Sequence, residues 1–243
     1  MMGLSSKVNY LRRQAADILD IIYPPACGLC GQPAETEDRL ICRKCWDSVE
    51  MLEAPYCLEC REFMPDSLTC PHCSGKTIAV FSLGYFDSTL RSIIHDLKFN
   101  GLKPLARPLG DKLAELIMAG SKTPSFDMIA AVPLHYSRQY LRGFNQAEEL
   151  ARELSRALGV PLVEDILVMT RKTRQQARLS ASRRAANVKG AYALGENVSS
   201  LKNGSVLLVD DVTTTGATIR ETARVLYTGS ARKVTAAVIA TAS

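Results

Sequence analysis

Val206-Leu207-Leu208-Val209-Asp210-Asp211-Val212-Thr213-Thr214-Thr215-Gly216-Ala217-Thr218 is the stretch that decides the fold. Its four leading apolar residues predict a strand that is buried on both faces, as in a parallel sheet. Asp210 and Asp211 would stand at the carboxyl end of that strand, where open α/β sheets bind ligands. The Thr/Gly loop opens a helical pattern, and backbone N–H groups at a helix N-terminus suit a phosphate. Because like charges repel, the two carboxylates suit sugar hydroxyls or a metal ion instead. The stretch therefore predicts a site for a ribose 5-phosphate.

This order of residues resembles the signature with which type I phosphoribosyltransferases bind 5-phosphoribosyl 1-pyrophosphate (PRPP). An acidic pair alone would indicate only a capped turn between strand and helix, but the threonines and the glycine after it belong to the signature. The resemblance implies that Asp210 and Asp211 hold the 2′- and 3′-hydroxyls of the ribose. It also implies that a loop wraps the 5-phosphate, formed by Thr213, Thr214, Thr215, Gly216, Ala217 and Thr218.

The composition is that of a globular protein with one α/β domain and a small additional module, since 47% of the 243 residues are hydrophobic. No apolar run is long enough to span a membrane, and residues 1–20 lack the apolar core and cleavage site of a secretory signal. The net charge of +5 suits anionic partners without separating phosphates from nucleic acids. We therefore expect a cytoplasmic protein.

Eight cysteines without an export signal point to metal ligands in a reducing compartment rather than to disulfides. They form four Cys-x-x-Cys pairs: Cys27 and Cys30, Cys42 and Cys45, Cys57 and Cys60, and Cys70 and Cys73. Each pair directs two thiolates at one ion, and two pairs complete a tetrahedral zinc site. We predict two structural zinc ions, with consecutive pairs joined in a double zinc ribbon.

Two alternatives stay open for these cysteines. The intervals inside each ribbon, eleven and nine residues, are shorter than the usual span of about fifteen to twenty, so interleaved pairing is a second solution. Thiolates also hold iron–sulfur clusters. His72 lies inside the last pair and is interpreted as a spectator, because eight cysteines already fill two sites. The segment lacks a dense basic cluster, which favours a structural or docking role over nucleic-acid reading.

Beyond the cysteines, strand and helix patterns alternate, which predicts an α/β domain with a parallel sheet flanked by helices. Strands are expected over residues 78–86 (at a sheet edge), 127–133, 162–169, 192–194, 206–209 and 234–241. Asp87 is expected to cap one helix, Pro104 to open a second, and Asn145 with Glu148 to open a third as a capping box. A further helix is expected over residues 8–22, before the cysteines.

Arg138 and Arg142 lie between the strand over 127–133 and the helix that follows Asn145. On their own they would count as surface residues of a loop. With the Asp210 stretch present, a loop at the carboxyl end of a parallel strand is the expected place for a diphosphate contact. Guanidinium groups make bidentate, charge-assisted bonds to phosphates, so Arg138 and Arg142 are predicted to bind the pyrophosphate of PRPP.

Several motifs together resemble the ComF family (competence protein F, amidophosphoribosyltransferase-like). They are Arg142-Gly143-Phe144-Asn145-Gln146 after Val132-Pro133, Leu97-Lys98-Phe99, the cysteine pairs and the C-terminal signature. The resemblance implies a type I phosphoribosyltransferase fold, a PRPP site and a role in natural transformation. Single-stranded DNA or DNA-processing proteins would then be partners. We expect a zinc-ribbon module over residues 1–75 and a phosphoribosyltransferase-like domain over 76–243, with the boundary near Ser74-Gly75-Lys76.

Residues 171–189 carry seven basic side chains and no acidic one. Charge runs are usually solvated faces. In type I phosphoribosyltransferases, however, a mobile loop in this region closes over PRPP, and ComF proteins share the Gln…Leu…Arg…Asn pattern found here. The resemblance implies that Arg183 reaches the phosphates, with Gln176 as a second candidate. A patch for DNA phosphates is the competing interpretation, although the segment offers no aromatic residue for base stacking.

Three functions are compatible with these features. The first is a Mg²⁺-dependent glycosyltransferase that releases pyrophosphate from PRPP, in which Asp210 and Asp211 serve the ribose and, indirectly, the metal. The second is a binding protein with little turnover that handles single-stranded DNA. The third is a PRPP-sensing regulator whose ribbon contacts a partner. No motif discloses an acceptor, and a homodimer stays open because many proteins of this fold pair.

Overall fold

The computed structural model describes residues 25–34, 40–73, 77–119, 125–173 and 181–242. The chain forms two compact units, residues 1–49 and 50–243. The helix predicted over 8–22 and the boundary predicted at 74–76 lie outside the described residues. None of the described helices is both long and apolar enough to cross a membrane.

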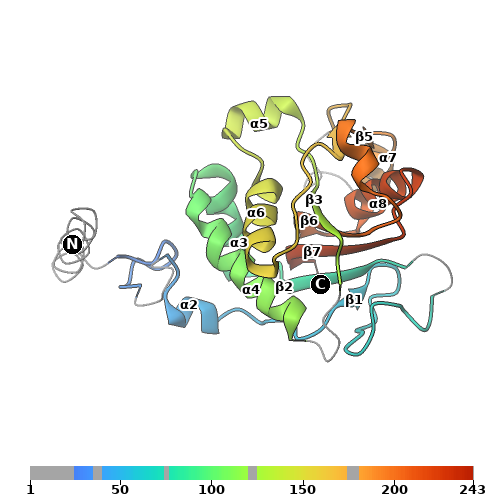
Figure 1. Cartoon of the computed structure of the whole chain (residues 1–243). Coiled ribbons are helices and arrows are strands. Elements are labelled where there is room, and N and C mark those ends of the chain that lie inside the picture. Colours follow the sequence, from blue (N-terminus) through green and yellow to red (C-terminus); the bar gives the residue numbers. More distant parts are fainter. Residues whose placement is uncertain (1–24, 35–39, 74–76, 120–124, 174–180, 243) are drawn as a thin grey trace, which may run out of the picture. The chain divides into compact units, whose positions relative to one another are not determined.

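A five-stranded sheet forms the centre of the larger unit (Figure 1). Four strands run parallel, in the order β2 (Ala79–Tyr85), β7 (Lys233–Thr241), β6 (Ser205–Thr213) and β3 (Met128–Ala131). Strand β6 lies between two neighbours and is buried along nearly its whole length. This confirms the strand predicted from Val206 to Val209, whose continuous apolar run suits a strand covered on both faces.

The strand predicted over residues 78–86 is present as β2, but its predicted place at the sheet edge is wrong. Strand β1 (Tyr56–Cys57), from the cysteine-rich segment, pairs antiparallel with β2 and takes the edge. The N–H of Leu58 also donates to the carbonyl of Ile78 at 2.9 Å. Tyr56 pairs with Val80 and Cys57 with Ala79, a long-range pairing that local patterning does not reveal.

Helices cover both faces of the sheet, as the alternating pattern predicted (Figure 1). Helices α3 (Ser88–Phe99), α4 (Ala106–Met118) and α6 (Gln146–Leu158) lie on one face, and α8 (Ala217–Thr228) lies on the other. The side chain of Asp87 accepts a hydrogen bond from the N–H of Leu90 at 2.9 Å, which confirms the predicted cap of α3. A short 3-10 helix, η1 (Lys103–Leu105), holds Pro104 in its first turn and leads into α4.

The side chain of Asn145 caps α6 by accepting from the N–H of Ala147 at 3.1 Å. Its amide also donates to the carbonyl of Val132 at 3.1 Å and to Glu148 Oε1 at 3.0 Å. The predicted capping box is thus present in a modified form, because Glu148 bonds the Asn145 side chain rather than its backbone N–H. Asn145 consequently fixes the start of α6 to the carboxyl end of β3.

Three further elements surround the carboxyl end of the sheet. Strands β4 (Leu167–Met169) and β5 (Tyr192–Leu194) form a separate antiparallel pair, and α7 (Ala181–Val188) lies between them in sequence.

The connection that holds Arg138 and Arg142 was predicted as a loop, but it forms helix α5 (Tyr136–Arg142). The His135 ring nitrogen accepts from the N–H of Ser137 at 3.3 Å, and Gly143 ends the helix in the left-handed conformation. The other short helices are α2 (Arg43–Asp47) in the smaller unit and η3 (Glu196–Ser200).

Candidate functional site

The eight cysteines form two separate four-sulfur clusters. Cys27, Cys30, Cys42 and Cys45 make up the first, and Cys57, Cys60, Cys70 and Cys73 make up the second. The predicted pairing of consecutive Cys-x-x-Cys turns is therefore confirmed, and the interleaved alternative is excluded. The first cluster lies in the smaller unit and the second in the larger unit.

The spacing of the sulfur atoms fits tetrahedral zinc. A bond of about 2.3 Å from zinc to each sulfur places the four sulfurs of a regular tetrahedron about 3.8 Å apart. The Sγ atoms of Cys27 and Cys45 are 3.8 Å apart, and those of Cys30 and Cys42 are 3.6 Å apart. In the second cluster, the corresponding distances are 3.9 Å for Cys57 and Cys73 and 3.5 Å for Cys60 and Cys70. Both clusters are therefore suited to hold zinc as structural sites.

Asp210 and Asp211 lie at the carboxyl end of β6 and are both buried. Each carboxylate bonds the next backbone amide: the N–H of Asp211 donates to Asp210 Oδ1 at 2.8 Å, and the N–H of Val212 donates to Asp211 Oδ1 at 2.7 Å. These bonds fix the side chains at the end of the strand, where the sequence placed them.

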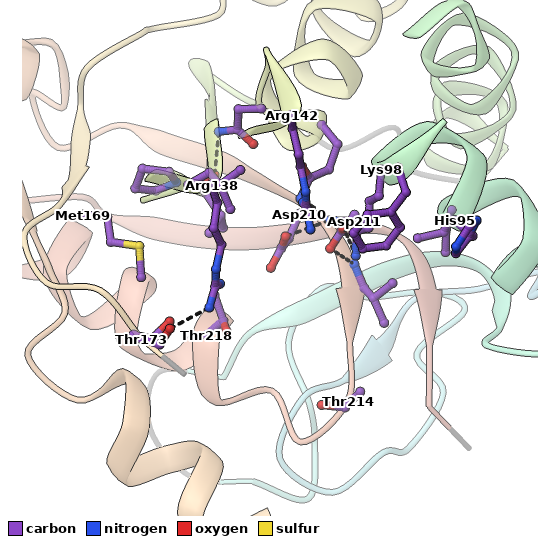
Figure 2. A pocket seen from close by; sticks show the side chains of 18 of the residues that line it. His95, Lys98, Arg138, Arg142, Met169, Thr173, Asp210, Asp211, Thr214 and Thr218 are labelled. Carbon is purple, nitrogen blue, oxygen red and sulfur yellow. Dashed lines mark hydrogen bonds and ion pairs between the residues drawn. The ribbon is translucent and has the colours of Figure 1, made fainter. Parts of the chain in front are cut away.

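A chain of polar contacts from three helices reaches Asp211 (Figure 2). Lys98 Nζ, on α3, forms an ion pair with Asp211 Oδ2. Gln146 Nε2, in the first turn of α6, donates to the same oxygen at 3.1 Å. Arg142, at the end of α5, donates to Gln146 Oε1 at 2.9 Å, and its guanidinium lies over the ring of Phe99 at 4.9 Å. Asp211 is therefore the point at which α3, α5 and α6 meet the sheet.

The protein shifts the pKa values of the two acids in opposite directions. Burial raises the pKa of Asp210 well above its usual value, and the neighbouring charge of Asp211 adds to the rise. Burial also acts to raise the pKa of Asp211, but the charge and hydrogen bond of Lys98 outweigh it and lower that pKa. One carboxyl group of the pair is thus kept ionised, while the other binds a proton more readily than usual.

The loop after β6 has the conformation and chemistry of an anion site. Gly216 has φ 75°, in the left-handed region, and precedes the first residue of α8. Among the described residues, Thr213 Oγ1 and Thr215 Oγ1 are buried without a hydrogen-bond partner. Leaving a buried hydroxyl unpaired costs on the order of 1–3 kcal/mol. A bound phosphate, with several acceptor oxygens, would remove such a cost.

Asp210 and Asp211 line a pocket of about 420 Å³ (Figure 2). Five cationic side chains line it together with the two carboxylates: Arg91, Lys98, Arg138, Arg142 and Arg184. Thr214 and Thr218 of the loop also line it, as do the aromatic rings of Phe86, Phe99 and Tyr192. The excess of cations over carboxylates suits a ligand with several negative charges.

The structure brings the predicted residues together unequally. Arg138 and Arg142 line the pocket, and Arg138 donates to the carbonyl of Thr173 at 2.6 Å. Arg183 is exposed on α7, whereas its neighbour Arg184 lines the pocket. Gln176 lies outside the described residues. The ligand contacts assigned to all these residues stay predictions.

The pocket residues that sequence reasoning missed include Arg91, Lys98, Gln146, Arg184 and Tyr192. Lys98 and Gln146 belong to two of the motifs quoted above, which was the signal available for them. Their pairing with Asp211 joins residues more than sixty positions apart, so only the folded chain reveals it. Burial, together with the nearby charge of Asp210, raises the pKa of Tyr192.

Comparisons with known proteins agree with both parts of the chain. The double zinc ribbon domain family matches residues 18–74, and the phosphoribosyl transferase domain family matches residues 142–243. DNA utilization protein YhgH of Salmonella typhi is 33% identical over 88% of this chain and 96% of its own length. Competence protein F of Haemophilus influenzae is 30% identical over 76% of this chain and 83% of its own length.

A solved structure of glutamine PRPP amidotransferase from B. subtilis is similar over 55% of this chain and 25% of its own length. The identity is 19% and the TM-score is 0.37.

Proposed function

The chain belongs to the family of competence protein F and DNA utilization protein YhgH, and from this premise we propose that its pocket binds PRPP. The observation that carries the proposal is the position of two buried carboxylates directly before a left-handed glycine turn with unpaired threonine hydroxyls, beside five cationic side chains. In this proposal Asp210 and Asp211 accept hydrogen bonds from the ribose hydroxyls. The loop from Thr213 to Thr218 binds the 5-phosphate, and Arg138 and Arg142 bind the pyrophosphate.

At this site the ligand would supply more of the Mg²⁺-coordinating oxygens than the protein. Carboxylate oxygens suit the ion, but Asp211 is already occupied by Lys98 and Gln146. The phosphate and ribose oxygens of PRPP would therefore supply most of the metal ligands, with the acids acting on the hydroxyls. Bound with PRPP, Mg²⁺ would supply neutralisation of the charge on the departing pyrophosphate.

We further propose that the site transfers the phosphoribosyl group to an acceptor. In that reaction the bond from C1 of ribose to pyrophosphate breaks, and a bond from C1 to the acceptor forms. The residues of this chain orient the ribose, hold the leaving group and exclude water. The reduced thiols that the zinc clusters need suit the cytoplasm, where we place the protein.

Calorimetric titration of the zinc-loaded protein with PRPP, with and without Mg²⁺, tests the binding proposal. We expect saturable binding that Asp211→Asn weakens at least about tenfold, since hydrogen bonds to a charged group contribute about 1.5–3 kcal/mol. The matched control is Glu115→Gln, an exposed carboxylate on α4, which should bind as the unaltered protein does. The absence of binding at millimolar PRPP would contradict the proposal. Pyrophosphate release with a panel of nucleobases and amines then tests transfer.

A second candidate function, binding of single-stranded nucleic acid, is favoured by helix α5. Tyr136 and Tyr140, one turn apart, have exposed fractions of 78% and 89%. Arg138 and Arg142 of the same helix line the cationic pocket. Exposed aromatic rings beside cations form stacking platforms that contribute about 1–3 kcal/mol for each base. The names of the relatives, which refer to DNA utilization and competence, agree with this candidate.

Fluorescence anisotropy of a labelled thymidine oligonucleotide across a range of salt concentrations tests this candidate. The double variant Tyr136→Ala and Tyr140→Ala should weaken binding at least about tenfold. The double variant with Phe at both positions keeps the rings and should bind normally. Met118→Ala, which removes another exposed apolar side chain on α4, is the control for nonspecific loss of surface. Equal affinities for all variants would exclude α5 as the platform.

A further inference from the structure

The second cysteine cluster contacts the loop that is proposed to bind the 5-phosphate. Residues 57–61, the turn between Cys57 and Arg61, are called the second knuckle here. Arg61 Nη2 donates to the carbonyl of Thr214, and Arg61 Nη1 donates to Thr241 Oγ1 at 3.2 Å. The guanidinium lies over the ring of Tyr56 at 5.1 Å, and the hydroxyl of Tyr56 bonds Thr241 Oγ1 at 2.8 Å. Arg61 is thus held on both sides.

A second arginine joins the same two segments from α8. Arg220 Nη1 donates to the carbonyl of Thr215 at 2.6 Å. Arg220 Nη2 donates to the carbonyl of Leu58 in the knuckle at 3.2 Å, and Nε donates to Glu59 Oε1 at 2.9 Å. A Cβ atom added to Gly216 would lie 2.7 Å from Leu58 Cδ1, so the knuckle also packs tightly against the loop backbone.

These contacts act on the peptide groups that a phosphate would use. The peptide unit is planar and trans, so the carbonyl of one residue points opposite to the N–H of the next. Fixing the carbonyls of Thr214 and Thr215 therefore fixes the directions of the N–H groups of Thr215 and Gly216. Those N–H groups lie at the start of α8, where a helix binds anions.

The first cluster contains a turn of the same form without the arginine. There Gly31 has φ 69° and its N–H donates to the carbonyl of Cys27 at 2.9 Å. In the second knuckle Arg61 has φ 66° and its N–H donates to the carbonyl of Cys57 at 2.9 Å. Glycine adopts this left-handed conformation freely, whereas arginine adopts it at a cost. The turn itself therefore does not require arginine at position 61.

We propose that Arg61 and Arg220 are positioning residues through which the metal-loaded second ribbon holds the phosphate loop in its binding conformation. The inference rests on the proposed PRPP site. Zinc suits the second cluster, where it would keep the turn from Cys57 to Cys60 closed. Arg61 directly follows this turn. The second ribbon is then a component of the ligand site and not only a folding module.

Arg61→Gly is the decisive variant, because it converts the second knuckle to the form of the first. We expect it to retain two zinc ions per chain by colorimetric assay and to bind ribose 5-phosphate at least about tenfold more weakly. Pyrophosphate should bind within about twofold of the unaltered protein, because its proposed ligands lie on α5. Ser230→Gly, an exposed left-handed position after α8 with φ 73°, is the matched control and should change neither affinity.

Hydrogen exchange of the amides of residues 213–218 without ligand provides a readout that does not depend on PRPP. Arg61→Gly should accelerate exchange there, and Ser230→Gly should not. If Arg61→Gly accelerates exchange but the unaltered protein binds no ribose 5-phosphate, the proposed function is overturned and the positioning role stands. Normal exchange and normal ribose 5-phosphate affinity in Arg61→Gly would overturn the positioning role and leave the proposed function standing.

Discussion

Asp210 and Asp211 are chemically identical neighbours whose surroundings differ. Lys98 and Gln146 contact Asp211, whereas the Asp210 carboxylate accepts a hydrogen bond from the backbone N–H of Asp211. Two adjacent buried carboxylates repel each other, and a cation beside one of them favours the ionised form of that carboxylate. Lys98 therefore decides which member of the pair carries the charge.

Replacement of Lys98 by Met should destabilise the protein by about 3 kcal/mol at pH 7, because it leaves a buried carboxylate without its cation. The pH dependence of this destabilisation follows from Asp211, because Lys98 lowers its pKa. A lowered carboxyl pKa stabilises the fold above the unfolded value, and this stabilisation is lost as the pH falls through the folded value. The gap between Lys98→Met and the unaltered protein should therefore be full above about pH 4, the unfolded value, and narrow as the pH falls below it.

Urea unfolding at several pH values measures this gap. Lys98→Arg keeps the positive charge and is the matched control, for which we expect a smaller loss at neutral pH. A gap that stays constant from pH 7 down to pH 2 would show that Lys98 contributes through packing rather than through its charge on Asp211.

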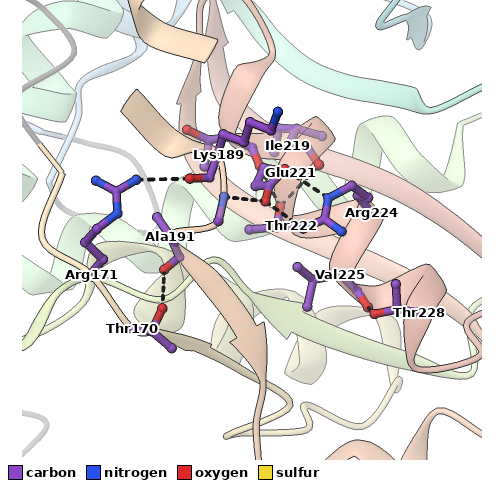
Figure 3. A network of polar contacts seen from close by, with 12 residues as sticks. Thr170, Arg171, Lys189, Ala191, Ile219, Glu221, Thr222, Arg224, Val225 and Thr228 are labelled. Carbon is purple, nitrogen blue, oxygen red and sulfur yellow. Dashed lines mark hydrogen bonds and ion pairs between the residues drawn. The ribbon is translucent and has the colours of Figure 1, made fainter. Parts of the chain in front are cut away.

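At the scale of elements, Glu221 of α8 forms a hydrogen bond with the segment that joins β4 to β5 (Figure 3). Glu221 Oε1 accepts from the N–H of Gly190 at 2.8 Å and from Arg224 Nη2 at 2.8 Å. Arg171 donates to the carbonyl of Lys189 at 3.0 Å, which joins the two ends of the segment. The segment that contributes Arg184 to the pocket therefore has a fixed base on α8, the helix that follows the loop from Thr213 to Thr218.

Glu221→Gln should destabilise the protein by about 1–2 kcal/mol at pH 7, because it weakens charge-assisted bonds at a buried position. The hydrogen bond from Arg224 is the largest cause that lowers the pKa of Glu221, against burial, which raises it. The stabilisation is present above the unfolded value of about 4.3 and disappears as the pH falls through the lowered folded value. Thermal unfolding from pH 2 to pH 8 measures it.

The control for this change is Glu115→Gln, since Glu115 makes an exposed pair with Lys112 on α4. Exposed pairs contribute about 0–1 kcal/mol, so the control should be near neutral. Equal stability of Glu221→Gln and the control would mean that the network in Figure 3 does not hold the segment.

The elements that sequence reasoning predicted are those whose signals are local. Strand β6 has a continuous apolar run, and α3 has a capping aspartate before a helical apolar face with Leu90, Ile93, Ile94 and Leu97 buried. Helix α5 was missed because none of its residues is buried, so no apolar period marks it. Strand β1 was missed because two residues carry too little pattern and their partner strand comes later in the chain.

The same distinction applies to the site. Asp210, Asp211 and the threonine loop are contiguous in sequence, so a motif could reveal them. Lys98, Gln146 and Arg61 act across long separations, and each needed the fold to bring it to its partner. Residues of a contiguous motif were therefore easier to predict than residues that contact the motif from distant parts of the chain.

At the scale of the whole molecule, the two zinc clusters have different relations to the α/β domain. The second cluster belongs to the larger unit, where Tyr56 and Leu58 are part of the hydrophobic core that includes β6 and α8. The first cluster belongs to the smaller unit and packs with Ala34 and Leu29. One zinc site is thus built into the domain that holds the pocket, and the other has a small core of its own.

Loss of the second site should consequently damage the pocket domain more than loss of the first. Cys57→Ser with Cys60→Ser opens the second knuckle, which releases Leu58 from the core and uncovers the edge of β2. We expect the larger unit to lose about 3 kcal/mol, the magnitude of a large side chain removed from a core. Cys27→Ser with Cys30→Ser makes the matched change in the first cluster and should leave the unfolding of the larger unit unchanged. Hydrogen exchange of β6 and β7 amides in the full chain separates the two results, and equal effects of both variants would contradict the assignment.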